Sequence, residues 1–296
     1  MPQSTKLRKV TPYAFIALPL AYMTVIIIGP AVAEIWTSFT DSTTADPTSG
    51  TFIGLGNYRD IIGSGELLRT LITTVCFMLG TVALTVLLGT TAAVLLDRPF
   101  RGRGAARSIL TFGWAVPPVA TALGWSWLYN QQSGVLNEIL GLLGLPSQAW
   151  LTSEDSALFS VIAAVVWQFS PFVMLVVLAT LQSVPEEVVE AARIDKADAL
   201  NVFRAVTLPH IKPAIRLAAL LIGIWSMRMF ELIFLLTGGG PLNSTSTLVV
   251  SLQQAAFRDY SLGKAAAFGV IGLMLSLLVA AVYQYFEKRE ARGAAQ

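Results

Sequence analysis

The chain has 296 residues, of which 54% are hydrophobic and only 13% are charged, with a net charge of +2 and a mean hydropathy of +0.65. A soluble domain normally carries about twice this charged fraction, so the composition argues against a soluble protein, and the near-neutral charge gives no reason to expect nucleic acid as a partner. The only cysteine, Cys76, lies in an apolar run, which excludes disulfides and cysteine-rich metal sites.

Six segments meet the requirement of roughly 20 mostly apolar residues for a membrane span. They are residues 13–37, 70–96, 108–128, 157–181, 214–237 and 264–286. The first is too long for a cleavable signal sequence, so we expect it to be retained. The third is interrupted by Pro117-Pro118, and the fifth carries Arg228 and Glu231. The sequence therefore predicts an all-α membrane protein with one membrane domain over residues 13–286.

The basic residues of the connecting segments predict the orientation in the membrane, because cytoplasmic segments are enriched in Lys and Arg. With the N-terminus inside, the outside segments hold only Arg59, Arg69, Arg258 and Lys264, and nearly all other basic residues fall on the inside. We therefore expect residues 1–12 and 287–296 to be cytoplasmic, an arrangement that six spans allow.

The inside segment from Ser183 to Pro213 has the pattern of two short helices. Ser183 and Glu186 have the spacing of a capping box, and a second helical run over residues 198–208 is expected to stop at Pro209, with Pro213 preceding the next span. Physical reasoning alone leaves two interpretations open: a solvated amphipathic connector, or a surface on which another protein docks.

Within this segment, the sequence EAARID at residues 190–195, followed by Leu208-Pro209 and Lys212-Pro213, resembles the EAA loop of permease subunits of binding-protein-dependent ABC importers. The resemblance implies that the loop inserts into a cleft of a separate ATPase subunit. One departure is Lys196, which stands where the family usually has a glycine after the aspartate. The coupling residues implied by the resemblance are Glu187, Glu190, Ala191, Ala192, Arg193, Asp195 and Lys196.

Two further segments are similar to the sugar branch of this family, the maltose and glycerol-phosphate type. They are FIGLGNY at residues 52–58, and FELIFLLTGGGP at residues 230–241 with STST at residues 244–247. The resemblance implies a type I importer fold in the cell membrane of a prokaryote, surrounded by lipid. The implied partners are a second homologous permease, two ATPase subunits that hold ATP and magnesium, an extracytoplasmic solute-binding protein and a sugar.

Polar and aromatic residues within the predicted spans are candidates for lining the substrate path. Charges inside a span are costly and usually face a cavity or a partner, and an aromatic ring beside polar groups suits a sugar, whose apolar C–H face can stack on it. The candidates are Trp125, Asn130, Trp167, Gln168, Trp225, Arg228 and Glu231. Two alternatives stay open: a structural ion pair from Arg228 and Glu231 to the neighbouring permease, and an interfacial aromatic belt for the tryptophans of the third span.

The sequence contains no phosphate-binding loop of the G-x-x-x-x-G-K-[ST] type and no catalytic constellation. We therefore expect no enzymatic activity and no cofactor in this chain, and an external source of energy for transport. His210, the only histidine, cannot build a histidine-based metal site. The alternative to an ATP-driven importer is an ion-coupled secondary transporter in which Arg228 and Glu231 form the coupling pair.

Overall fold

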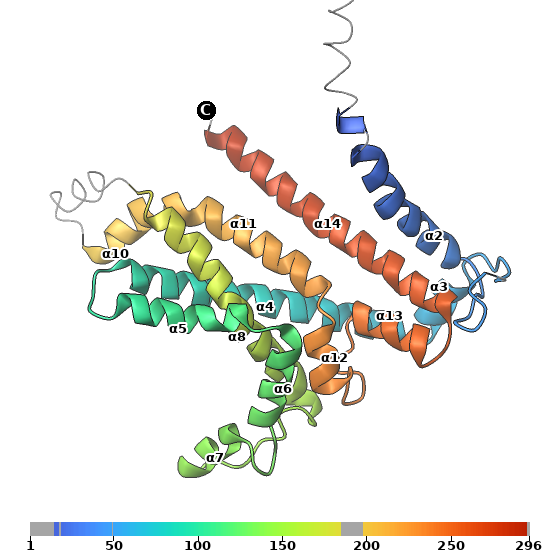
Figure 1. Ribbon diagram of the computed structural model, residues 1–296, viewed down its shortest axis with the longest axis horizontal. Coiled ribbons are helices and arrows are strands. Elements are labelled where there is room, and N and C mark those ends of the chain that lie inside the picture. The colour runs from blue at the N-terminus through green and yellow to red at the C-terminus, as the bar shows by residue number, and fades with distance from the viewer. Residues whose placement is uncertain (1–14, 18, 49, 185–197, 295–296) are drawn as a thin grey trace, which may run out of the picture. The chain divides into compact units, whose positions relative to one another are not determined.

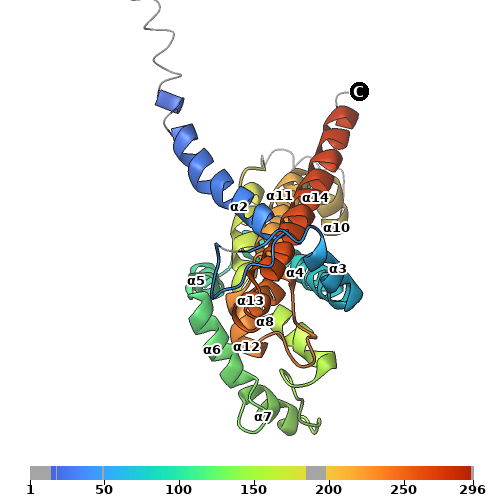
Figure 2. The ribbon, with the colours of Figure 1, turned by 90° about the vertical axis from the view of Figure 1, so that its right-hand side faces the viewer.

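The computed structural model describes residues 15–17, 19–48, 50–184 and 198–294, and these are organised as helices joined by loops (Figures 1 and 2). Only two isolated β-bridges occur in these ranges, Thr40 with Phe52 and Thr43 with Ser261, so the predicted all-α fold is confirmed. The helices are η1 (Thr24–Ile28), α2 (Gly29–Thr37), α3 (Gly56–Gly63), α4 (Glu66–Asp97), α5 (Arg103–Ala115), α6 (Pro118–Leu128), α7 (Val135–Leu142), α8 (Glu154–Leu181), α10 (Ala199–Val202), η2 (Phe203–Thr207), α11 (Leu208–Met227), α12 (Glu231–Thr237), α13 (Leu248–Phe257) and α14 (Leu262–Ala294).

Five helical stretches in the described ranges are long and apolar enough to cross a membrane: Phe15–Thr37, Glu66–Asp97, Glu154–Leu181, Phe203–Met227 and Leu262–Arg289. They overlap five of the predicted spans. The chain divides into two compact units, one formed by Met1–Leu67 and Leu252–Leu273 and the other by Leu68–Ser251 and Met274–Gln296.

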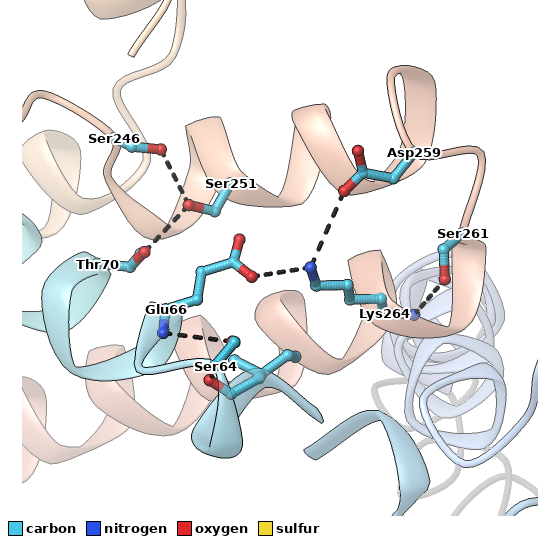
Figure 3. A network of polar contacts seen from close by, with 9 residues as sticks. Ser64, Glu66, Thr70, Ser246, Ser251, Asp259, Ser261 and Lys264 are labelled. Atoms are coloured by element: carbon cyan, nitrogen blue, oxygen red, sulfur yellow. Dashed lines mark hydrogen bonds and ion pairs between the residues drawn. The ribbon is translucent and has the colours of Figure 1, made fainter. Parts of the chain in front are cut away.

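The first unit is tied together by the FIGLGNY segment. Asn57 is buried, and its Nδ2 donates to the carbonyl oxygens of Ser38 (2.9 Å) and Thr40 (2.8 Å). Gly263, at the start of α14, lies so close to the carbonyl of Thr40 that no Cβ could fit there. Lys264, one residue later, has its Nζ 2.8 Å from Glu66 and 3.9 Å from Asp259 (Figure 3). Together these contacts hold the loop that follows the first span in place.

The second unit is built around α8, which contributes to both of its hydrophobic clusters. Val165 and Val173 of α8 are fully buried, as is Ile222 of α11. Gly89 of α4 approaches α8 so closely that an added Cβ would lie 2.8 Å from the carbonyl oxygen of Ser170. The small residue is needed there because only glycine permits this approach of two helix backbones.

The third predicted span, residues 108–128, is not one helix, which corrects the expectation of an uninterrupted span. It consists of α5 and α6, and Val116 between them is extended, with φ −78° and ψ 129°. The reason is that a proline clashes with a preceding residue in helical conformation, and Pro117 and Pro118 also lack the N–H groups that would continue the helix. Figure 1 shows α6 leaving the end of α5 in a different direction.

The fifth predicted span, residues 214–237, also differs from the expectation. The helical run does not stop at Pro209: it continues from α10 through the π-helical turn η2 into α11, with Pro209 in the first turn of α11 and Pro213 inside the helix. Pro209 has no N–H group to donate. It is accommodated because the π-turn before it is wider than an α-helical turn and because it lies in the first turn of α11. At its other end α11 stops at Met227, and α12 begins at Glu231.

The glycine-rich segment after α12 is held by hydroxyl groups. Gly238 ends α12 with a left-handed φ of 61°, and Thr245 donates to the carbonyl of Gly240 (2.9 Å) and contacts the hydroxyl of Thr237 (2.7 Å). Ser251 links Ser246 (3.0 Å) to Thr70 of α4 (3.2 Å; Figure 3). The STST sequence therefore supplies the hydrogen bonds that fix this loop on α4.

Candidate substrate path and ATPase-coupling loop

Trp225, near the end of α11, lies in a cluster of aromatic rings contributed by three helices. Its ring centroid is 4.9 Å from that of Phe172, 5.8 Å from that of Trp114 and 5.9 Å from that of Phe169. We call these four residues the inner aromatic cluster. Beside it is a small cavity whose lining includes Thr81, Phe169, Trp225 and Ser226, and which has no room for a water molecule. Aromatic side chains are therefore gathered where α5, α8 and α11 meet, and the space beside them is too small for a water molecule.

Trp125 and Trp167, predicted on different spans, are brought together. Their ring centroids are 6.1 Å apart in an edge-to-face arrangement, a favourable geometry for aromatic pairs. From Trp125 the row continues to Tyr129 (5.1 Å) and from Tyr129 to Trp150 (5.7 Å). The Tyr129 hydroxyl donates to the carbonyl of Ser160 (2.8 Å) and so fixes the end of α6 on α8.

Sequence reasoning did not single out Trp114, Phe169 or Phe172 as members of the site. A signal was present in the spacing of Phe169 and Phe172, which lie on one face of α8 three residues apart, on either side of Pro171. Trp114 carried no such signal, because its contact with Trp225 (5.8 Å between ring centroids) depends on how α5 packs against α8 and α11.

Gln168 faces protein. Its side chain is 3% exposed, and Nε2 donates to the carbonyl oxygen of Val116 at 2.9 Å. Gln168, the only residue of α8 with an amide side chain, therefore contacts the backbone at the break between α5 and α6. Its Oε1 is buried and has no hydrogen-bond partner among the described residues.

Arg228 and Glu231 do not form an ion pair in the part of the chain that the structure describes. The predicted fifth span, which carries both residues, is interrupted between them, because α11 ends at Met227 and α12 begins at Glu231. Both side chains are exposed in the isolated subunit. Because the helix is interrupted between them, each of the two charged side chains can contact another molecule.

Asn130, at the end of α6, has a local function in the loop that follows. Its Oδ1 accepts hydrogen bonds from the backbone N–H groups of Gln132 and Ser133 (both 3.0 Å), and also from the Ser133 hydroxyl (3.2 Å). Such a turn is a common role for asparagine. Only its Nδ2 group is left by these contacts for any other molecule.

The predicted coupling residues Glu187, Glu190, Ala191, Ala192, Arg193, Asp195 and Lys196 lie outside the described residues. The two ends of this segment are described. At its start, the Ser183 hydroxyl donates to the carbonyl of Thr180 (2.7 Å) and lies 3.1 Å from Nε2 of His210, near the start of α11. This contact joins the stretch just after α8 to the first turn of α11.

Comparison with known proteins agrees with the arrangement of helices. The family described as "Binding-protein-dependent transport system inner membrane component" matches residues 85–292. The chain is 36% identical over 267 residues to the trehalose/maltose transport system permease protein MalF of Thermococcus litoralis, which covers 90% of this chain and 89% of that protein. It is 31% identical over 261 residues to the sulfoquinovosyl glycerol transport system permease protein SmoG of Agrobacterium fabrum, covering 88% and 85%.

Among solved structures, the fold matches a chain of a bacterial ABC transporter that imports the acidic polysaccharide alginate, with a TM-score of 0.83. The match covers 96% of this chain and 97% of that chain at 18% identity, so it bears on the fold alone. An ion-coupled mechanism built on an Arg228–Glu231 pair is not supported, because the residues are unpaired with one another and the matching family depends on a binding protein. The family match spans most of the chain, so the protein belongs to the inner membrane components of binding-protein-dependent transport systems, and is a transport permease.

Proposed function

We propose that this permease is one of two homologous membrane subunits of an ATP-driven sugar importer and forms half of its translocation path. The observation that carries the proposal is the similarity over 90% of the chain to a permease named for trehalose and maltose transport. A second relative is named for sulfoquinovosyl glycerol transport. Sugars and sugar-like polyols therefore form the substrate class that we assign to the complete transporter.

The proposed path includes the inner aromatic cluster and the Trp125–Trp167 pair. Their rings offer apolar faces on which the C–H face of a sugar can stack, and Thr81 and Ser226 add hydroxyl groups at the edge of the cavity. We assign Arg228 and Glu231, exposed at the break between α11 and α12, to the same path or to the contact with the second permease. A guanidinium group there can donate hydrogen bonds to the hydroxyl groups of a disaccharide and to the oxygens of a phosphorylated polyol.

The proposed source of energy is a separate pair of ATPase subunits, which hold ATP and magnesium. Residues 187–196 form the contact with the ATPase, and a small-residue surface at Ala191 and Ala192 lets the partner approach closely. Closure of the ATPase dimer on ATP would be transmitted through this loop to α8 and α11 and switch the spans between inward-facing and outward-facing states. A solute-binding protein delivers the sugar from outside.

The test is reconstitution of the complete transporter in proteoliposomes with its binding protein. ATP-dependent uptake of a labelled sugar is expected, together with loss of ATPase association in Ala192→Arg. Ala105→Arg serves as the matched control, since Ala105 is an exposed alanine in another inside segment. The proposal fails if no ATPase co-purifies, if uptake follows an imposed proton or sodium gradient without ATP, or if Ala192→Arg still retains the ATPase.

A further inference from the structure

We propose that Gln168 is a positioning residue for transport: its side chain sets the angle between α5 and α6 by binding the backbone carbonyl that the Pro117-Pro118 break leaves free. The inference rests on the proposed function in one respect, because α6 carries Trp125 of the proposed path. The hydrogen bond itself, 2.9 Å from Nε2 of Gln168 to the carbonyl oxygen of Val116, is independent of that function.

The break creates an unpaired backbone group. In a continuous helix the Val116 carbonyl would accept from the N–H four residues later, but Val116 is extended and lies outside both helices. The first carbonyl that α6 uses is that of Pro117, which accepts from the N–H of Thr121 at 3.0 Å. In a membrane span, a carbonyl without such a partner must be satisfied by neighbouring protein groups. Gln168 provides that partner.

The helices α5 and α8 are in backbone contact at this point. Gly113, in the last turn of α5, lies where an added Cβ would be 3.0 Å from the carbonyl oxygen of Trp167. That carbonyl belongs to the residue four before Pro171, so the N–H that would normally bond it is missing. Both helices therefore have an interrupted hydrogen-bond ladder where they meet, and the side chain next to Trp167 bridges the gap to Val116.

The surroundings of residue 168 favour a glutamine side chain. Gln168 is 3% exposed, so its amide is shielded from water. The Val116 carbonyl requires a hydrogen-bond donor, and an apolar side chain of similar volume has none. The Oε1 atom is buried and has no donor among the residues that the structure describes, so the amide uses only part of its hydrogen-bonding capacity in this conformation.

The consequence concerns Trp125. It lies on α6, and its partner Trp167 is adjacent to Gln168 on α8. An α6 that is free to change its angle to α5 carries Trp125 away from Trp167 and opens the aromatic row. Gln168 thus acts on the path through the direction of α6, without contact with the sugar.

The angle can be measured directly with two spin labels. Ile109 on α5 is 74% exposed and Leu123 on α6 is 63% exposed, so cysteines at these positions accept labels without disturbing the core, in a Cys76→Ser background. The experiment compares the label–label distance distribution of the complete transporter in nanodiscs for wild type, Gln168→Met and Gln168→His. Gln182→Met, an exposed glutamine at the end of α8, is the matched control.

Gln168→Met is expected to broaden or shift the distance distribution and to lower the maximal uptake rate about 10-fold, the effect of one unsatisfied buried carbonyl. The concentration of loaded binding protein at half-maximal rate is expected to stay unchanged. Gln168→His keeps an N–H donor and is expected to retain a narrow distribution. The inference is overturned if Gln168→Met matches wild type in distance, or if Met and His disturb it equally. The distance measurement requires no substrate, so it separates this inference from failure of the proposed function.

Discussion

The hydroxyl of Ser183 lies 3.1 Å from Nε2 of His210, so the residues just after α8 contact the first turn of α11. Ser183 follows the end of α8, and His210 lies in the first turn of α11.

The first prediction concerns this contact. Ser183→Ala or His210→Ala is expected to weaken the coupling between the loop and the two helices, because one exposed hydrogen bond contributes about 0.5–1.5 kcal/mol. The ratio of sugar transported to ATP hydrolysed should then fall by a factor of about 2–10. A double-mutant cycle measures whether the two residues act together. If the loss in the double variant equals the sum of the losses in the two single variants, the contact has no role in coupling.

The second prediction concerns the approach of α4 to α8. Gly89→Ala places a methyl group 2.6 Å from Cβ of Val173 and 2.8 Å from the carbonyl oxygen of Ser170, so the helices must separate. We expect a loss of about 1–3 kcal/mol in stability, seen as a lower melting temperature of the purified transporter. Gly104→Ala, in a helix with open space around it, is the control and should be neutral or stabilising. Equal melting temperatures for the two variants would contradict this packing.

The third prediction concerns Trp225. Trp225→Ala removes ring contacts with Phe172, Trp114 and Phe169, and we expect uptake to fall about 3–10-fold, since aromatic contacts contribute about 0.5–1.5 kcal/mol each. Trp225→Phe should retain most of the activity. Trp127→Ala is the control, because Trp127 is 81% exposed. Uptake assays at saturating binding protein make the comparison, and an Ala variant as active as wild type would remove Trp225 from the path.

The fourth prediction concerns Arg228 and Glu231. Because the two side chains are exposed and unpaired with one another in the described structure, Arg228→Ala should abolish uptake while assembly is retained. For the same reason, the charge exchange Arg228→Glu with Glu231→Arg should not restore uptake. Co-purification of all subunits measures assembly, and Arg258→Ala, at an exposed arginine directly after α13, is the control. Restoration by the exchange would show that the two residues do pair in the assembled transporter.

Hydropathy located the membrane helices because a span needs an apolar segment of fixed length, and this requirement is visible in sequence. The same reasoning failed at the ends of local elements. It placed a helix stop at Pro209, where a π-turn lets the chain continue, and it extended one helix across Arg228–Phe230. Propensity does not reveal whether neighbouring groups compensate for a missing N–H, since those groups come from elsewhere in the chain.

The sequence by itself determined the class of the protein: its apolar spans, the distribution of its basic residues and its EAA-like segment are all patterns within short stretches of chain. Only the tertiary structure decided what the candidate residues touch. Gln168 is directed at the carbonyl of Val116, 52 residues away, and Trp225 at rings from α5 and α8. These contacts depend on how α5, α8 and α11 pack. Glycines and prolines set this packing, and they act on helices that are far away in the sequence.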